Sequence, residues 1–335
     1  MSFAGAVPYV IGQWVRGDRF YGRRAELAEL AASGGWHWLA GLRRVGKTSL
    51  LKQLDFLHTG SSRRLPVFWD LQGVDGAEEL AFTFGDALLD AEEALESLGI
   101  DPGEIEDDDL FAALSKLARA LEASEAELLL LCDEVDELAA LADSHPDLLA
   151  GLHRALDAFP RLQVVLASSV RLCDQPFPEP PPDLLRRCGA PRYLGVLTNA
   201  EALSLVRQDQ LPEAARPALD AAAEQALLTA AGNHPMLLQI LAKRCAELGS
   251  VEAALEQVAA DRAVDHFFSV DFDLLAPAER QLLLELAARG SAPVSEAQRL
   301  LELGLVRREG DGLVLGGTLL GGWLRLTGAK PPPTR

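Results

Sequence analysis

Lysine is scarce in this chain of 335 residues, and basic residues are outnumbered by acidic ones. Only five of the thirty-one basic residues are lysines, and fifty acidic residues bring the net charge to −19. A protein whose main task is to grip nucleic acid needs clustered positive charge for the phosphates. The composition therefore argues against that class of protein, although a basic patch confined to one domain remains compatible with it.

Cysteine is also rare: the four cysteines are scattered and no C-x-x-C occurs, which argues against a zinc site or a redox pair. Cys132 lies in an apolar run, and we interpret it as a reduced thiol in the core. No apolar run approaches the length of about eighteen residues that suggests a membrane-spanning helix, and no signal peptide is recognisable. With 49% hydrophobic residues, the chain is expected to be a globular, cytoplasmic protein of two or three domains.

The most informative feature that is present is the segment 41–48, Gly-Leu-Arg-Arg-Val-Gly-Lys-Thr. It fits the phosphate-loop pattern G-x-x-x-x-G-K-[ST] at every fixed position. Residues 36–40 predict a short buried strand before the loop, and residues 49–54 predict a helix after it. In that order, backbone N–H groups point at a phosphate and the helix N-terminus adds positive potential. The sequence therefore predicts a nucleoside triphosphate site.

Within this loop, Lys47 is expected to bridge the β- and γ-phosphates, and the Thr48 hydroxyl is expected to hold Mg²⁺. The two arginines of the loop could face solvent, the nucleotide or a neighbouring subunit. No N-K-x-D motif for guanine occurs in the sequence, so ATP or ADP is favoured over a guanine nucleotide. The residues of this segment expected to contact the nucleotide are Gly41, Arg44, Val45, Gly46, Lys47, Thr48 and Ser49.

An acidic pair closes a second apolar run. Asp133 and Glu134 follow the leucines 128–131, one predicted strand after the loop. We expect Asp133 to be a Mg²⁺ ligand and Glu134 to be the general base that polarises the attacking water, with charge complementarity to a helix N-terminus as the alternative for Glu134. Ser168 ends the next predicted strand. We expect it to sense the γ-phosphate, and the alternative is ordinary capping of the strand end.

Strand and helix patterns alternate through the first two hundred residues, which is typical of right-handed βαβ units and a parallel sheet. The expected strands are 36–40, 65–71, 127–133, 162–168 and 192–196. The expected helices in this part are near 24–32, 49–57, 77–98, 109–123 and 146–158. The predicted fold class is an α/β P-loop NTPase with the strand order 5-1-4-3-2.

Beyond residue 197 the strand patterns give way to helices, and a Gly-Asp-Gly turn at 310–312 between two short β runs predicts a hairpin. Helices followed by a hairpin suggest a winged helix. The proline-rich segment 175–182 is interpreted as a rigid connector, with recognition by a partner as the alternative. The expected domains are a P-loop domain with an N-terminal arm (1–197), a helical lid (198–262) and a winged-helix-like domain with a short tail (263–335).

Three blocks of sequence together resemble the STAND class of P-loop ATPases, in its AAA-like bacterial and archaeal branch. The first block is the N-terminal arm, which is similar to that family's F-x-G-R-x-x-E-L entry. The second combines the loop with the apolar run that ends in Asp133 and Glu134. The third is similar to a G-x-P element that opens a helix. In this sequence the blocks are 8–12 with 19–27, 41–51 with 128–134, and 232–235 with 236–241.

This resemblance implies an ATP-operated switch. In the family, ADP sits between the P-loop domain, the helical domain and the winged helix and holds a closed state, and exchange for ATP opens it and promotes assembly. The resemblance also implies that Phe20, Tyr21, Gly22 and Arg23 line the adenine pocket. It further implies that His234 and Pro235 lie near the nucleotide, and the alternative for His234 is a position beside the helix N-terminus.

The sequence departs from that family in two ways. It has no Met-His-Asp triplet in the winged-helix region, and its end near residue 335 leaves no room for sensor repeats or an effector domain. A separate effector or sensor protein is therefore the expected partner, and a nucleotide-dependent homo-oligomer is possible. The alternative function is an ATPase that acts on DNA through its winged helix, suggested by Arg299, Arg307 and Arg308 and opposed by the net charge. A scaffold with degenerate catalysis is the third hypothesis, which the intact catalytic positions disfavour.

Overall fold

The computed structural model describes residues 8–32, 34–105, 109–174, 183–293 and 297–328. The chain divides into two compact units. The first, here named the sheet unit, comprises Arg24–Ala40 and Lys47–Arg192. The second, the helical unit, comprises the residues up to Arg23, the loop residues Gly41–Gly46 and the residues from Tyr193 onward. The boundary thus passes through the phosphate-loop segment. The proline-rich segment predicted to be a connector lies outside the described residues.

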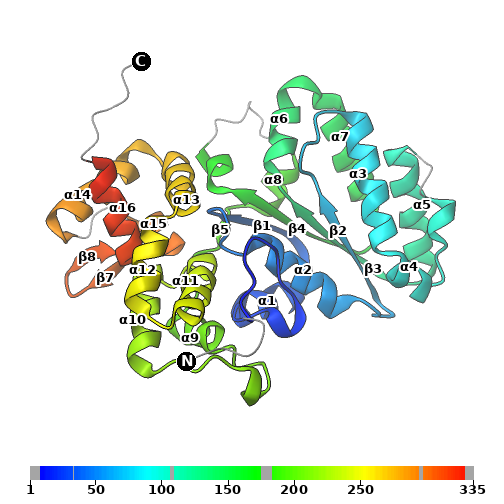
Figure 1. The fold of residues 1–335 in the computed structure, drawn as a ribbon. Helices are drawn as coiled ribbons and strands as arrows, with labels where there is room; N and C mark the ends of the chain where they lie inside the picture. Colours follow the sequence, from blue (N-terminus) through cyan, green and yellow to red (C-terminus); the bar gives the residue numbers. More distant parts are fainter. Residues whose placement is uncertain (1–7, 33, 106–108, 175–182, 294–296, 329–335) are drawn as a thin grey trace. The chain divides into compact units, whose positions relative to one another are not determined.

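Five strands form the main sheet in the order β2-β3-β4-β1-β5 (Figure 1). They are β1 (Gly35–Gly41), β2 (Arg64–Asp70), β3 (Glu127–Asp133), β4 (Leu162–Ser169) and β5 (Arg192–Tyr193). The predicted order 5-1-4-3-2 is confirmed, because it is the same order counted from the opposite edge. β3 pairs in parallel with both β2 and β4, as the alternation of strands and helices predicts.

The central strand β3 explains why the apolar run ends in an acid. All its residues from Leu128 to Asp133 are buried. Leu130 and Cys132 belong to the same core cluster as Trp69 of β2, which confirms that Cys132 is a core thiol. A parallel strand that is covered on both faces has no solvent side, so its sequence is apolar throughout. The first polar position after that run falls at the carboxyl end of the strand, where Asp133 lies.

Helices cover both faces of this sheet. Those of the sheet unit are α1 (Arg24–Ala32), α2 (Lys47–His58), α3 (Ala77–Asp90), α4 (Glu92–Ser97), α5 (Leu110–Ala123), α6 (Asp136–Ser144), α7 (Pro146–Asp157), α8 (Asp183–Cys188) and the 3₁₀ turns η2 (Pro102–Glu104) and η3 (Val170–Asp174). Side chains of α3, α5 and α7 share the core cluster with β2, β3 and β4, and α2 also packs against β2 and β3. Within the ranges given above, none of the helices is both long and apolar enough to span a membrane.

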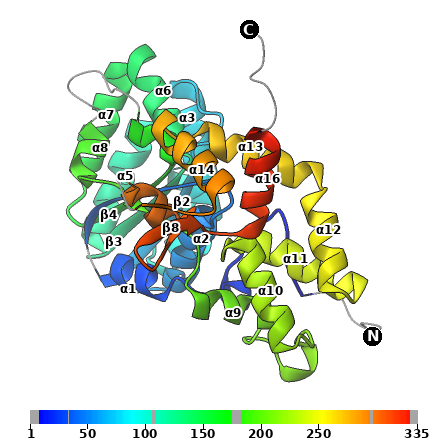
Figure 2. The same ribbon diagram turned by 90° about the vertical axis from the view of Figure 1, so that its left-hand side faces the viewer.

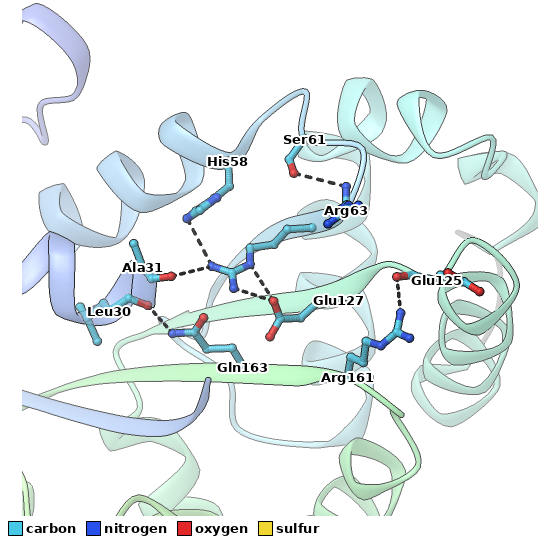
Figure 3. Close-up of polar contacts among 10 residues, drawn as sticks. Leu30, Ala31, His58, Ser61, Arg63, Glu125, Glu127, Arg161 and Gln163 are labelled. Atoms are coloured by element: carbon cyan, nitrogen blue, oxygen red, sulfur yellow. Dashed lines mark hydrogen bonds and ion pairs between the residues drawn. The ribbon is translucent and has the colours of Figure 1, made fainter. Parts of the chain in front are cut away.

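A polar cluster at the amino ends of β2, β3 and β4 holds the end of α1 (Figure 3). Arg64 donates from Nε to Glu127 at 2.8 Å and from Nη1 to the carbonyl of Ala31 at 3.3 Å. The side-chain amide of Gln163 donates to the carbonyl of Leu30 at 2.5 Å. The last carbonyls of a helix have no partner within the helix, so these bonds cap α1. Structural contacts therefore occupy this end of the strands.

The helical unit consists mainly of helices, and α9, α10, α11 and α12 lie side by side in it (Figures 1 and 2). Its helices are α9 (Asn199–Arg207), α10 (Ala221–Ala231), α11 (Pro235–Leu248), α12 (Val251–Ala259), α13 (Arg262–Asp273), α14 (Pro277–Arg289), α15 (Gln298–Leu303), α16 (Thr318–Gly328) and the 3₁₀ turns η1 (Gly17–Arg19) and η4 (Glu213–Ala215). A small antiparallel sheet has the order β6-β8-β7, with β6 (Ala292–Pro293), β7 (Val306–Glu309) and β8 (Gly312–Leu315). The predicted hairpin is confirmed by β7 and β8.

Candidate functional site

The two fixed glycines of the loop are required for different physical reasons. A Cβ added to Gly41 would lie 2.9 Å from the carbonyl oxygen of Leu194 and 3.1 Å from Cγ1 of Val45, so that position has no room for a side chain. Gly46 has φ +103°, a conformation that L-residues rarely adopt, while a Cβ there would meet no atom within 4 Å. The loop therefore closes tightly at its start and leaves open space beside its second glycine.

Two further contacts hold the loop inside the helical unit. Arg44 has φ +58°, and its guanidinium donates to the carbonyl of Gly12 at 3.2 Å. The backbone N–H of Arg43 donates to Oδ1 of Asp271, a buried carboxylate of α13, at 3.2 Å. Nothing in the sequence singles out Asp271, because one aspartate in a distant amphipathic helix carries no recognisable signal.

The start of α2 and the end of β3 meet inside the sheet unit. Lys47, Thr48 and Ser49 form the first turn of α2, and the Thr48 side chain hydrogen-bonds with Asp133. Asp133 is only 3% exposed, and burial raises the pKa of its carboxyl. The bond from Thr48 and the positive charge of Lys47 offset that shift only in part. A hydroxyl and a carboxylate are hard oxygen donors that suit Mg²⁺, so this pair fits the predicted metal.

Glu134 directly follows in a strained backbone conformation. Its φ is +53°, which is unusual for a residue with a side chain. Although much of the side chain is exposed, partial desolvation raises the pKa of the carboxyl, and the negative charge of Asp133 raises it further. Asp70, which no sequence pattern singles out, ends β2 in register with Asp133 and adds a third carboxylate. The carboxyl edge of these strands therefore concentrates negative charge near Lys47.

Ser168 is fully buried in β4, and its hydroxyl is already engaged. It accepts a hydrogen bond from Nε1 of Trp38 at 2.8 Å and donates to the carbonyl of Ser169 at 3.0 Å. Ser169, in turn, donates from its N–H and its hydroxyl to Asp136 of α6, at 2.8 and 2.6 Å. These contacts link the ends of β4 and β3. A γ-phosphate-sensing role for Ser168 stays a prediction.

The residues predicted from resemblance to line an adenine pocket lie in the helical unit. Phe20 and Tyr21 are buried, and a Cβ on Gly22 would lie 2.8 Å from the side chain of Glu201. Arg23 is also buried, and its guanidinium donates to backbone carbonyls. Contact between this segment and a base stays a prediction.

His234 occupies the N-cap position of α11, directly before Pro235. Its ring is buried edge-on against Phe267, with 5.1 Å between ring centroids, and neither ring nitrogen makes a hydrogen bond of normal geometry to the described residues. Burial lowers its pKa from 6.5 to about 4, so the ring is neutral at neutral pH. Together with Leu42 and Val45 of the loop, His234 and Phe267 line a cavity of about 40 Å³.

Comparisons with known proteins extend this description. No family model matches the sequence, and no curated protein does. Among solved structures, the Walker-type ATPase PABY2304 of Pyrococcus abyssi matches 95% of this chain and 99% of its own, with a TM-score of 0.66 and 16% identity. The chain shares the fold of that ATPase. This confirms the predicted α/β P-loop NTPase class, and at this identity the likeness shows the fold alone.

Two Aeropyrum pernix structures are similar at a lower level. The ORC2 protein in its ADPNP–ADP complexes matches 96% of this chain and 97% of its own, with a TM-score of 0.49 and 12% identity. The ORC1 protein in complex with DNA matches 92% and 94%, with a TM-score of 0.47 and 15% identity.

The three arginines that suggested DNA binding lie near the small sheet, and two of them have carboxylate partners. Arg299 forms a two-pronged ion pair with Glu279, and both side chains are about 15% exposed. Arg307 pairs with Glu309 at 2.8 Å on the surface of β7, and Arg308 is exposed. Neutralised guanidiniums attract phosphates less strongly, so these contacts do not favour the DNA-binding alternative.

Proposed function

We propose that this protein binds ATP with Mg²⁺ at the loop 41–48 and hydrolyses it. The observation that carries the proposal is the contact between Thr48, in the first turn of α2, and Asp133, at the end of the buried strand β3. A glycine-rich turn, a helix N-terminus and a strand-end carboxylate next to a hydroxyl are the parts that phosphoryl transfer uses.

Each group has a distinct part in the proposed reaction. Lys47 would place its ammonium between the β- and γ-phosphates, while the N–H of Gly46 and the start of α2 bind phosphate oxygens. Thr48 and Asp133 would hold Mg²⁺, which supplies positive charge for the phosphate oxygens. Glu134 would accept a proton from the attacking water, a role that suits a carboxyl whose pKa is raised toward the operating pH.

We further propose that hydrolysis is slow and that the protein works as a STAND-type switch with a separate effector or sensor, in bacterial signalling or defence. In this proposal, residues 198–262 act as a helical lid and residues 263–335 as a winged-helix-like domain. Support comes from the three sequence blocks that resemble the STAND class and from the helices followed by the β7–β8 hairpin. No N-K-x-D motif is present, which supports adenine.

Rates of ATP hydrolysis and ATP affinities, measured on the same variants, distinguish residues that catalyse hydrolysis from residues that bind ATP. The Glu134→Gln variant should lose about 100-fold or more in ATP hydrolysis, because the amide cannot accept a proton, and should keep its ATP affinity. Lys47→Ala should weaken ATP binding about 10- to 100-fold through the loss of charge-assisted bonds. Glu137→Gln, in the first turn of α6, is the matched control and should hydrolyse ATP like the wild type. Equal turnover in Glu134→Gln and Glu137→Gln would exclude Glu134 as the base.

The switch proposal is tested by measuring the molar mass of the protein in solution with each nucleotide. Light scattering coupled to gel filtration should show a different assembly state with an ATP analogue than with ADP, for the chain with or without a candidate partner. A monomer under both nucleotides, with and without partners, would count against the switch and would leave the ATPase proposal standing.

A further inference from the structure

A buried arginine grips the phosphate loop from within the helical unit. Arg23 is 4% exposed, and its Nη2 donates to the carbonyls of Val45, at 3.1 Å, and of Gly195. Its Nη1 donates to the carbonyl of Val196 at 3.4 Å, and its backbone N–H donates to Glu201 at 2.6 Å. One guanidinium therefore joins the loop to the segment that leads into α9.

The bond to Val45 has a consequence for the peptide that follows. The C=O and N–H of a trans peptide lie in one plane and point in opposite directions. Because Arg23 holds the carbonyl of the Val45–Gly46 peptide, the N–H of Gly46 points away from Arg23. Gly46 has the positive φ that this turn requires, and open space lies beside it. An N–H whose own peptide carbonyl is anchored keeps a fixed direction, and a fixed N–H in a glycine turn is suited to bind an anion.

We infer that Arg23 is a positioning residue of the phosphate loop: by anchoring the Val45 carbonyl, it keeps the Gly46 N–H oriented toward the phosphates. This inference rests on the proposed function. It assigns Arg23 a role through the loop backbone, whereas the resemblance implies a contact with adenine. A planar guanidinium suits the role because its fixed, diverging N–H groups reach several carbonyls at once, which the single ammonium of lysine does less well.

The hydrogen bond from Arg23 to the carbonyl of Gly195 ties the loop to a tightly packed part of the backbone. A Cβ on Gly195 would lie 2.0 Å from the carbonyl oxygen of Glu302, so the backbone there is packed tightly within the helical unit. Glu201 caps α9 together with Thr198 and also binds the Arg23 N–H. The loop peptide is therefore tied to a rigid part of the fold rather than to a mobile side chain.

Phosphate affinity, measured apart from base affinity, tests this role. The full chain and its Arg23→Gln and Arg23→Lys variants are titrated with ADP and with pyrophosphate, each in competition with a fluorescent ADP. We expect the Kd for both ligands to rise about 10- to 100-fold in Arg23→Gln, because a misaligned N–H loses a charge-assisted bond. Arg23→Lys should show a partial effect. Melting curves recorded without ligand show whether each variant is folded at the temperature of the titration.

The matched control is Arg64→Lys, which changes another arginine that donates to a backbone carbonyl, that of Ala31 at the end of α1. It should lower the melting temperature and leave both Kd values unchanged. If the Arg23 variants bind ADP more weakly but pyrophosphate normally, Arg23 contacts the base and the inference is wrong. Unchanged Kd values for both ligands in Arg23→Lys and Arg23→Gln overturn it as well. A wild-type chain that binds no fluorescent ADP refutes the proposed function itself.

Discussion

Asp133 is a charged side chain placed where water is nearly absent. Burial raises its pKa above the usual 3.8, so between the two pKa values the folded protein binds more protons than the unfolded chain. The contribution of Asp133 to stability is therefore greatest at low pH and falls as the pH rises through the raised pKa. The buried carboxylate of Asp133 destabilises the ligand-free protein at neutral pH, and a cation bound beside it would remove that cost.

We therefore expect Asp133→Asn to melt at a higher temperature than the wild type at pH 8, without nucleotide and Mg²⁺, because the amide removes the buried charge. The difference should shrink as the pH falls and the carboxyl becomes protonated, and Mg²⁺-dependent nucleotide binding should be lost. Thermal melts across this pH range check it, with Asp70→Asn as the control at the end of the neighbouring strand. An Asp133→Asn variant that melts lower than the wild type at pH 8 would show that the carboxylate stabilises the free fold.

At the scale of elements, the carboxyl ends and the amino ends of the sheet strands carry different kinds of side chain. The carboxyl ends of β2 and β3 carry the acids Asp70 and Asp133, and helix α2 starts with Lys47. The amino ends instead carry Arg64 and Gln163, which cap α1 (Figure 3). In α/β sheets, ligands bind at the carboxyl ends of parallel strands, so contacts at the amino ends contribute to stability.

Arg64→Met should therefore lower the free energy of unfolding by about 1.5–3 kcal/mol, because it removes charge-assisted bonds and leaves Glu127 half-buried without its partner. Nucleotide affinity should not change. Urea unfolding and nucleotide titration measure the two effects, and Arg63→Met changes the exposed neighbour as a control. A loss of affinity in folded Arg64→Met would mean that the two ends of the sheet are coupled.

Element prediction failed where the local pattern was weak. The expected helix 77–98 is two helices, α3 and α4, separated at Ala91, whose backbone N–H bonds to Leu88 and Leu89 at the end of α3. No range was predicted for helix α6, whose nine residues lack a capping side chain and lead directly into α7. Alanine-rich helix patterns carry little information about where a helix breaks.

For the whole molecule, net charge is the property that bears on partners. A charge of −19 repels nucleic acid at long range, and Arg299 is paired with Glu279. We expect no binding to duplex DNA up to about 10 μM protein at low salt, a range in which non-specific DNA-binding proteins bind. Fluorescence anisotropy with a labelled duplex measures it. Salt-dependent binding that disappears when Arg307 and Arg308 are changed to alanine would instead support the DNA-acting ATPase.

Local patterns were enough to predict the loop 41–48, the acidic pair after the apolar run and the alternation of strands with helices, because each depends on residue types at short, regular spacing. The strand order followed from the predicted fold class. The carboxyl ends of neighbouring parallel strands must lie at one edge, so the contact of Thr48 with Asp133 followed from the fold class. The partners of Arg23 and Asp271 became known only from packing. Their carbonyl and N–H partners are backbone groups, present at every residue, and nothing in the sequence distinguishes the ones that the folded chain brings within reach.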